Sequence, residues 1–257
     1  MHSILQNKKN ISYRSNPFPY FYIDDALPNE LYNSLSNSFP AFDKIISKNI
    51  GNNDFTENTA YRLSANESLI DPDITNEWKE FITYHTSSKF TDELFEIFLD
   101  DIRKIYNVKK EQLPNNQNTG IRFSNRYFFN TDCQFVINTP TSGDTKVIEP
   151  HLDNPKEFYA CLLYMKDEKD SSSGGNLTTH KFIGAPSFYG KSRVREEKVT
   201  LVEEIEYKAN RLVVFLNSPY SIHGVTKRSK TKFYRKYMNI IGEFNNELFD
   251  FRPFLEK

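Results

Sequence analysis

The hydrophobic periodicity of the chain changes at a polar stretch, "QLPNNQNTG" (112–120), and this change limits the folds open to the sequence. Before it, apolar residues recur at helical spacing, most clearly in "TDELFEIFLDDIRKIY" (91–106). After it come short runs rich in β-branched and aromatic residues, separated by turn residues. Strands with no helices between them are typical of a jelly roll or barrel. A chain in which the helices come first and the strands follow is predicted to form an α+β fold.

The expected elements follow from this division. A strand is expected within 18–27, and helices over 27–39 and 91–106, the latter with Thr91 as its N-cap. Eight strands are expected at 132–138, 146–153, 157–165, 175–182, 198–206, 211–217, 221–226 and 232–244. We expect one domain over 1–257, in which a mostly helical support (1–115) packs on one sheet of an eight-stranded core (121–257).

Charge and composition narrow the partners and the location. The net charge of −1 gives no overall field that would attract nucleic acid or an anionic membrane. No stretch approaches the roughly 18 to 20 apolar residues of a membrane span, and the first residues carry no signal-peptide pattern. Cys133 and Cys161 are too few for a disulfide framework. We therefore expect a cytoplasmic protein.

The stretch "EPHLDNP" (149–155) carries the strongest chemical signal. His151 and Asp153 lie two apart, so that a strand would point both to one face. A metal site needs a third ligand, and His223 on the seventh run supplies it if the second and seventh strands are neighbours, as a jelly roll allows. Two histidines and one carboxylate that leave three positions open form the facial triad of non-haem Fe(II) enzymes. His180, on the fourth run, is the alternative third ligand.

Several segments together resemble the double-stranded β-helix of the 2-oxoglutarate- and Fe(II)-dependent dioxygenases, in the branch that includes the prolyl hydroxylases. The resemblance lies in "PFPYFYIDDALPNELYNSLSNSFP" (17–40), "HLD" (151–153), "ACLLYM" (160–165), "SSSGGNL" (171–177), "NRLVVFLNSPYSIHGV" (210–225) and "FYRKYMNI" (233–240).

This resemblance implies a hydroxylase that uses Fe(II), 2-oxoglutarate and O2 and releases succinate and CO2. It implies His151, Asp153 and His223 as the iron ligands. It also implies a basic residue on the last strand that pairs with the distal carboxylate of 2-oxoglutarate, and Tyr164 near that carboxylate. Gly174 and Gly175 would form the tight turn before the fourth strand.

The basic anchor can be Arg235, Lys232 or Lys236, because strand alternation alone does not say which face points inward. We favour Arg235, since a guanidinium meets a carboxylate through two parallel hydrogen bonds. On its face, Asn239 follows as a further hydrogen-bonding residue of the 2-oxoglutarate site. Lys236 lies on the opposite face.

Two other functions stay open at this point. A cupin-like metal enzyme would share the barrel but use no 2-oxoglutarate, and a non-enzymatic β-sandwich module would bind no metal tightly. In such a module "TKRSKTKFYRK" (226–236) could bind phosphate or nucleic acid, although a solvated hairpin is the favoured interpretation. The segment "IGAPSFYGKSRVREE" (183–197) is either a surface loop or a lid over the substrate. The substrate, whether peptidyl proline, an amino acid or another small molecule, is not fixed.

Overall fold

The computed structural model describes residues 2–47, 56–106, 118–123, 127–143, 145, 148–190 and 192–256. Residues 112–117 of the polar stretch, 146–147 of the second run and Lys191 lie outside these ranges. The helices are α1 (Asn29–Asn37), α2 (Phe42–Ile46), α3 (Ala65–Ile70), α4 (Asn76–His85) and α5 (Ser88–Tyr106), with short 3-10 turns at Lys8–Asn10, Glu196–Lys198 and Arg252–Phe254.

The eight predicted strands are confirmed, each within a few residues of its expected bounds. They are β5 (Phe129–Asn138), β6 (Ile148–His151), β7 (Glu157–Tyr164), β8 (Leu177–Phe182), β9 (Val199–Ile205), β10 (Leu212–Leu216), β11 (His223–Val225) and β12 (Arg235–Phe244). The first part of the chain adds β1 (Ser12–Arg14), β2 (Tyr20–Ile23), β3 (Ala60–Leu63) and β4 (Thr119–Ile121).

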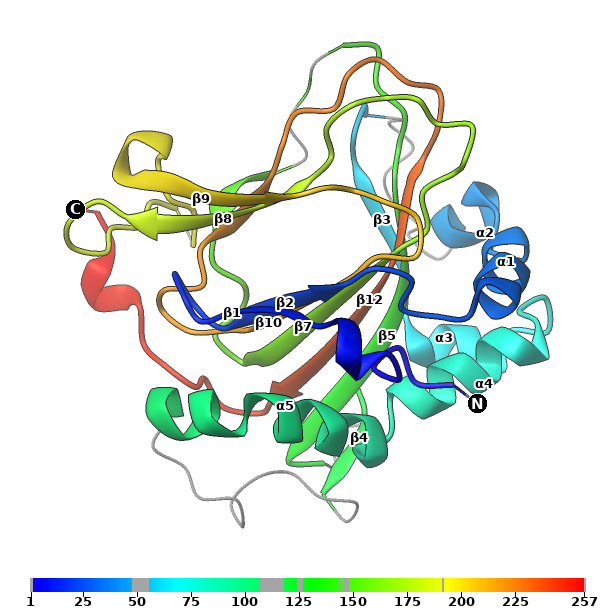
Figure 1. Cartoon of the computed structure of the whole chain (residues 1–257), viewed down its shortest axis with the longest axis horizontal. Coiled ribbons are helices and arrows are strands. Elements are labelled where there is room, and N and C mark those ends of the chain that lie inside the picture. The colour runs from blue at the N-terminus through cyan, green and yellow to red at the C-terminus, as the bar shows by residue number, and fades with distance from the viewer. Residues whose placement is uncertain are drawn as a thin grey trace.

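The strands form two sheets that face each other, as expected for a double-stranded β-helix. The large sheet has the order β1-β2-β10-β7-β12-β5-β3, with β4 beside β5. The small sheet has the order β6-β11-β8-β9. The helices lie on one side of the large sheet and strands β8 and β9 lie on its other side (Figure 1). The fold is thus α+β, with the helical part packed on one sheet.

Strand alternation in the large sheet separates a helix-facing core from an interior between the sheets. On β7, Cys161 and Leu163 join the core shared with the helices, whereas Ala160 and Tyr164 join the cluster that includes Leu177 of the small sheet. The same period-2 rule governs β10 and β12. It decides which side chains can reach a site between the two sheets.

The N-terminal part does more than support the core. Strands β1, β2 and β3 belong to the large sheet, because β2 pairs with β10 and β3 pairs with β5. The division into 1–115 and 121–257 therefore stays a prediction, with sheet strands on both sides of it. Helix α5 begins at Ser88, so Thr91 is not an N-cap but a buried residue inside the helix. Among the described residues, no helix combines the length and apolar character needed to cross a membrane.

Candidate metal and cosubstrate site

A cavity of about 620 Å³ opens between the two sheets. Its walls come from β3, β5, β6, β7, β8, β10, β11 and β12 and from the loops beside them. The lining includes His151, Asp153, Glu157, His223, Arg62, Arg122, Gln134, Asn138, Arg235, Tyr237 and Asn239. Polar and ionisable side chains therefore converge between the two sheets.

The pairing of β6 with β11 brings the three predicted metal ligands together. His151 and His223 are direct cross-strand partners, and their rings lie 4.4 Å apart between centroids. Strand β6 ends at His151, so Asp153 lies in the following loop rather than on the strand as we expected. Its carboxylate nevertheless lies 3.5 Å from Nε2 of each histidine.

Backbone contacts orient both imidazoles toward this point. Nδ1 of His151 lies 2.9 Å from the carbonyl oxygen of Glu149, and Nδ1 of His223 lies 2.9 Å from that of Ser221. A carbonyl only accepts, so each Nδ1 carries the proton and each Nε2 keeps its lone pair for a metal. Burial lowers the pKa of His223, which favours its neutral, ligating form. For Asp153, burial acts to raise the pKa, but His223 and His151 outweigh it and lower the pKa to about 2.

The donor set fits a divalent iron ion. One ligand atom from each of the three side chains lies within 4.8 Å of the others. Two imidazole nitrogens and one carboxylate oxygen are the ligand types of the facial triad. The cavity beside them leaves room for further ligands of the metal. Among the described residues no cysteine or further histidine joins the cluster, so the closed four-ligand set of structural zinc is not formed.

The register of β12 places the predicted cosubstrate residues on the cavity side. Arg235, Tyr237 and Asn239 line the cavity. Lys236 lies on the opposite face, where its Nζ is 5.7 Å from the ring centroid of Phe39. Asn239, four residues along β12 from Arg235, donates to the side chain of Gln134 at 3.4 Å.

Arg235 is a buried cation that has no carboxylate partner among the described residues. It is 2% exposed, and the rings of Tyr164, Tyr207 and Tyr237 surround its guanidinium at 4.8 to 5.2 Å. Its Nε donates to the carbonyl of Gly175 at 2.9 Å. Within the described part of the chain, neither Nη2 of Arg235 nor the buried hydroxyl of Tyr164 has a hydrogen-bond partner of normal geometry. Buried polar groups without partners are costly, so this corner is suited to an anionic ligand.

Two further residues of this corner were not found from the sequence. Tyr207 follows β9, and its hydroxyl binds the backbone of Lys236 at 2.8 and 3.1 Å, which fixes the start of β12. Arg228 is 1% exposed and donates to Asn58 and to two backbone carbonyls. Both lie outside any recognisable spacing from the triad. Only the folded arrangement of turns brings them to Arg235.

The glycine pair takes the conformation that we expected. Gly174 and Gly175 have φ values of +79° and +73°. A Cβ on Gly175 would lie 3.3 Å from Cδ and Nε of Arg235. The glycine therefore allows the backbone to approach the guanidinium closely enough to accept its hydrogen bond.

The segment 183–197 packs as an arm against β6. Phe188 and Val194 are fully buried with Leu152 and Ile222, and Phe251 and Phe254 of the C-terminal segment pack around them. The backbone of Leu152 donates to Ser192, and that of Val194 donates to Pro150. These contacts favour a brace for the strand that carries His151 over a freely moving lid.

Replacing Phe188 by alanine should therefore disturb the metal site from a distance. We expect the free energy of unfolding to fall by about 3 to 5 kcal/mol, the usual cost of removing a buried Phe ring. Fe(II) affinity should fall too, because Leu152 lies between two predicted ligands. Denaturant titration and metal titration measure the two effects. Loss of stability with unchanged metal affinity would contradict the bracing role; the exposed Ile183→Ala is the matched control.

The remaining histidines lie away from the triad. His85 is buried in α4 against Phe81, and burial lowers its pKa to about 3. His180 lies on β8 with Nε2 2.9 Å from the hydroxyl of Thr178, outside the cavity lining. The alternative ligand of the sequence analysis is thus not brought into the cluster.

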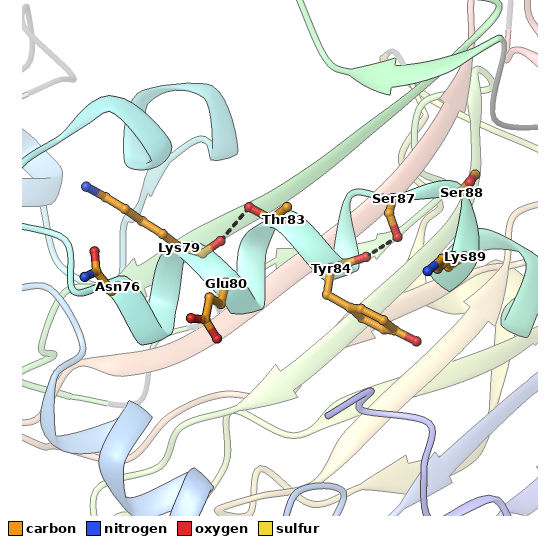
Figure 2. Close-up of a pocket in the computed structure, with 8 residues that line it drawn as sticks. All are labelled: Asn76, Lys79, Glu80, Thr83, Tyr84, Ser87, Ser88 and Lys89. Carbon is orange, nitrogen blue, oxygen red and sulfur yellow. Dashed lines mark hydrogen bonds between the residues drawn. The ribbon is translucent and has the colours of Figure 1, made fainter. Parts of the chain in front are cut away.

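A second hollow, of about 630 Å³, lies on the surface of α4 and α5. Figure 2 shows its lining, in which Thr83 and Ser87 bind backbone carbonyls of their own helical turns. Its residues are Asn76, Lys79, Glu80, Thr83, Tyr84, Ser87, Ser88 and Lys89. One carboxylate and two lysines on an open surface give it no catalytic arrangement comparable to the cavity.

Glu157 is the most perturbed acid in the cavity. Burial, and then the charge of Asp153, raise the pKa of Glu157 to about 8. It stands across from Glu243, whose carboxylate accepts from Nε of Arg122 at 2.9 Å. Neither the acid nor this ion pair was identified from the sequence.

Comparison with known proteins agrees with the chemistry of the cavity. Residues 135–240 match the family model of the 2OG-Fe(II) oxygenase superfamily, a segment that contains all three clustered ligands and Arg235. No curated protein matches the chain.

Many solved structures resemble the fold at low sequence identity. An oxygenase from Shewanella oneidensis is 12% identical, with 89% of this chain and 81% of that chain covered and a TM-score of 0.50. A prolyl-4-hydroxylase from Pseudomonas putida is 14% identical, with a TM-score of 0.45. The match covers 88% of this chain and 91% of that chain. One from Phytophthora capsici is 15% identical with a TM-score of 0.47; 88% of this chain is covered, but the chain spans only 59% of that protein.

Proposed function

We propose that this chain, a member of the 2OG-Fe(II) oxygenase superfamily, hydroxylates a C–H bond of its substrate through the triad of His151, Asp153 and His223. Iron(II), 2-oxoglutarate and O2 supply the oxidising chemistry of this family, with succinate and CO2 as products. The protein holds the metal, orients the cosubstrate and presents the substrate inside the cavity between the two sheets.

The three ligands divide the work of holding the ion. His151 and His223 offer the lone pairs of Nε2, which their backbone hydrogen bonds direct into the cavity. Asp153 faces both imidazoles and supplies one negative charge, so a bound divalent ion keeps a net positive charge toward the open side. That charge favours an anionic cosubstrate over a neutral one.

Arg235 and Tyr164 receive the distal carboxylate of 2-oxoglutarate. The observation that carries this proposal is that, within the described part of the chain, two buried groups have no hydrogen-bond partner of normal geometry, namely Nη2 of Arg235 and the hydroxyl of Tyr164. A carboxylate placed between them would satisfy both and would neutralise the guanidinium. Asn239 lines the same cavity farther along β12 and would add a hydrogen-bonding side chain to the cosubstrate site.

The rival functions explain this corner less well. A cupin-like enzyme without 2-oxoglutarate has no need for a buried guanidinium that has no carboxylate partner among the described residues. A β-sandwich binding module has no need for two imidazoles held with Nε2 toward one carboxylate.

The substrate stays open among peptidyl proline, amino acids and other small molecules. A cytoplasmic location is also a proposal, with both cysteines buried and unpaired.

A binding and turnover experiment tests the function. The purified chain is titrated with Fe(II) and then 2-oxoglutarate without oxygen, and the visible charge-transfer band of the chelate is followed. Addition of O2 should then release succinate slowly even without substrate. A protein that binds Fe(II) but gives neither the band nor succinate would favour the cupin-like alternative. A protein that binds no metal would favour the binding module.

A further inference from the structure

One end of the cavity carries charged groups that the proposed metal and cosubstrate sites do not use. Glu157 begins β7 and lines the cavity with Arg122 and Asp153. The charge of Asp153 acts on Glu157, which places the two carboxylates near each other. Glu243, the partner of Glu157, lies eight residues along β12 from Arg235, so the proposed cosubstrate corner leaves this end of the cavity to the substrate.

Glu157 lacks a partner for its carboxylate. The described residues offer it no hydrogen bond and no ion pair. Its cross-strand partner is Glu243, a second acid, and like charges on opposite residues repel. The charges of Arg122 and Arg62 reach Glu157, but Arg122 forms its ion pair with Glu243. A largely buried carboxylate in this position is stabilised by a cation that arrives with the ligand.

Arg122 complements Glu157 with unused donors. Its Nε donates to Glu243, but its two Nη groups make no hydrogen bond within the described part of the chain. A guanidinium edge of this kind binds a carboxylate through two hydrogen bonds. The cavity thus presents one acceptor for an ammonium group and one donor pair for a carboxylate.

We propose that the substrate is a free α-amino acid, whose ammonium group binds Glu157 and whose carboxylate binds Arg122. This inference rests on the proposed oxygenase function and names its substrate class. A small zwitterion satisfies both charged groups at once and fits with 2-oxoglutarate in a cavity of about 620 Å³. The backbone of an internal peptide residue carries neither charge and would leave both groups unpaired.

Binding can be measured apart from turnover. The protein is loaded with Fe(II) and 2-oxoglutarate without oxygen and titrated calorimetrically with each of the twenty proteinogenic L-amino acids. We expect at least one to bind. Its N-acetyl derivative and its amide should each bind at least about tenfold more weakly, since each loses one charged hydrogen-bonded pair.

The variant Glu157→Gln keeps the shape of the side chain but cannot ionise, whereas a bound ammonium group favours the ionised form of Glu157. It should weaken binding of the free amino acid at least about tenfold and leave the N-acetyl derivative within about twofold. That pattern separates a direct charge contact from general damage to the fold. Glu80→Gln, in the hollow on α4, is the matched control and should change neither affinity.

Two results would overturn the inference. One is binding of a proline-containing peptide with no free amino acid bound, which would leave the oxygenase function standing. The other is equal weakening of the free and the N-acetylated ligand in Glu157→Gln. If no succinate forms but a free amino acid binds through Glu157, the zwitterion site stands and the oxygenase function fails.

Discussion

Replacing His151, Asp153 or His223 by alanine is expected to abolish 2-oxoglutarate turnover while the fold survives. Each change removes one of three ligand atoms that lie within 4.8 Å of one another. Loss of a group that merely orients a ligand usually costs 10- to 100-fold in metal affinity, so loss of a ligand should weaken Fe(II) binding by at least about 100-fold. Metal titration and succinate release measure the two effects.

His180→Ala is the control for these variants. His180 binds Thr178 on the outer side of the small sheet and does not line the cavity, so turnover should be retained. Circular dichroism and thermal melting check that all four variants fold. A His180→Ala protein without metal binding, beside a His223→Ala protein with it, would show that the triad is assigned to the wrong strand.

The strand pattern could be predicted from the sequence because each strand is short, apolar and bounded by turn residues. The same alternation also gave the two faces of β12, but not the direction of each face. That direction depends on what covers the sheet: Met238 and Ile240 pack against the helices, which turns Arg235 and Tyr237 inward. The choice of Arg235 over Lys236 had to rest on chemistry until the helical layer was known.

The site could be predicted only where its residues share a local spacing. His151 and Asp153 are two apart, and His223 followed from the neighbouring positions of the second and seventh strands. Glu157 and Arg122 have no such relation. Glu157 meets Glu243 through the pairing of β7 with β12, where an irregularity between Gly242 and Glu243 sets the two opposite each other, and the side chain of Arg122 then binds Glu243. An irregularity of this kind is decided by packing across several strands and leaves no periodic signal.

The position of Asp153 could be predicted only in part from its spacing in the sequence. The i, i+2 spacing on a strand correctly predicts convergence with His151, but the strand ends at His151. What positions the aspartate is the loop held between the arm and β7, where Leu152 is buried and donates to Ser192. The spacing thus identified the correct pair of side chains, although the strand ends two residues before Asp153.

Arg235→Ala should raise the apparent constant for 2-oxoglutarate by at least about tenfold with Fe(II) affinity little changed. A charged hydrogen-bonded pair contributes roughly 1.5 to 3 kcal/mol, which corresponds to about 10- to 150-fold. The loss should fall on cosubstrate binding because the guanidinium has no carboxylate partner among the described residues and makes no contact with the triad. Tyr164→Phe, which removes one neutral donor, should give a smaller rise of about two- to tenfold.

Lys236→Ala tests the register of β12. Lys236 is adjacent in sequence but points toward Phe39 in the helical layer, so its removal should leave the 2-oxoglutarate constant within about twofold. Arg235→Lys adds a second check: it keeps the charge but loses the fork of the guanidinium, and should restore binding only in part. If Arg235→Ala leaves the 2-oxoglutarate constant unchanged and Lys236→Ala raises it strongly, the distal carboxylate does not bind Arg235. An anion other than 2-oxoglutarate would then have to be the partner of Nη2 of Arg235.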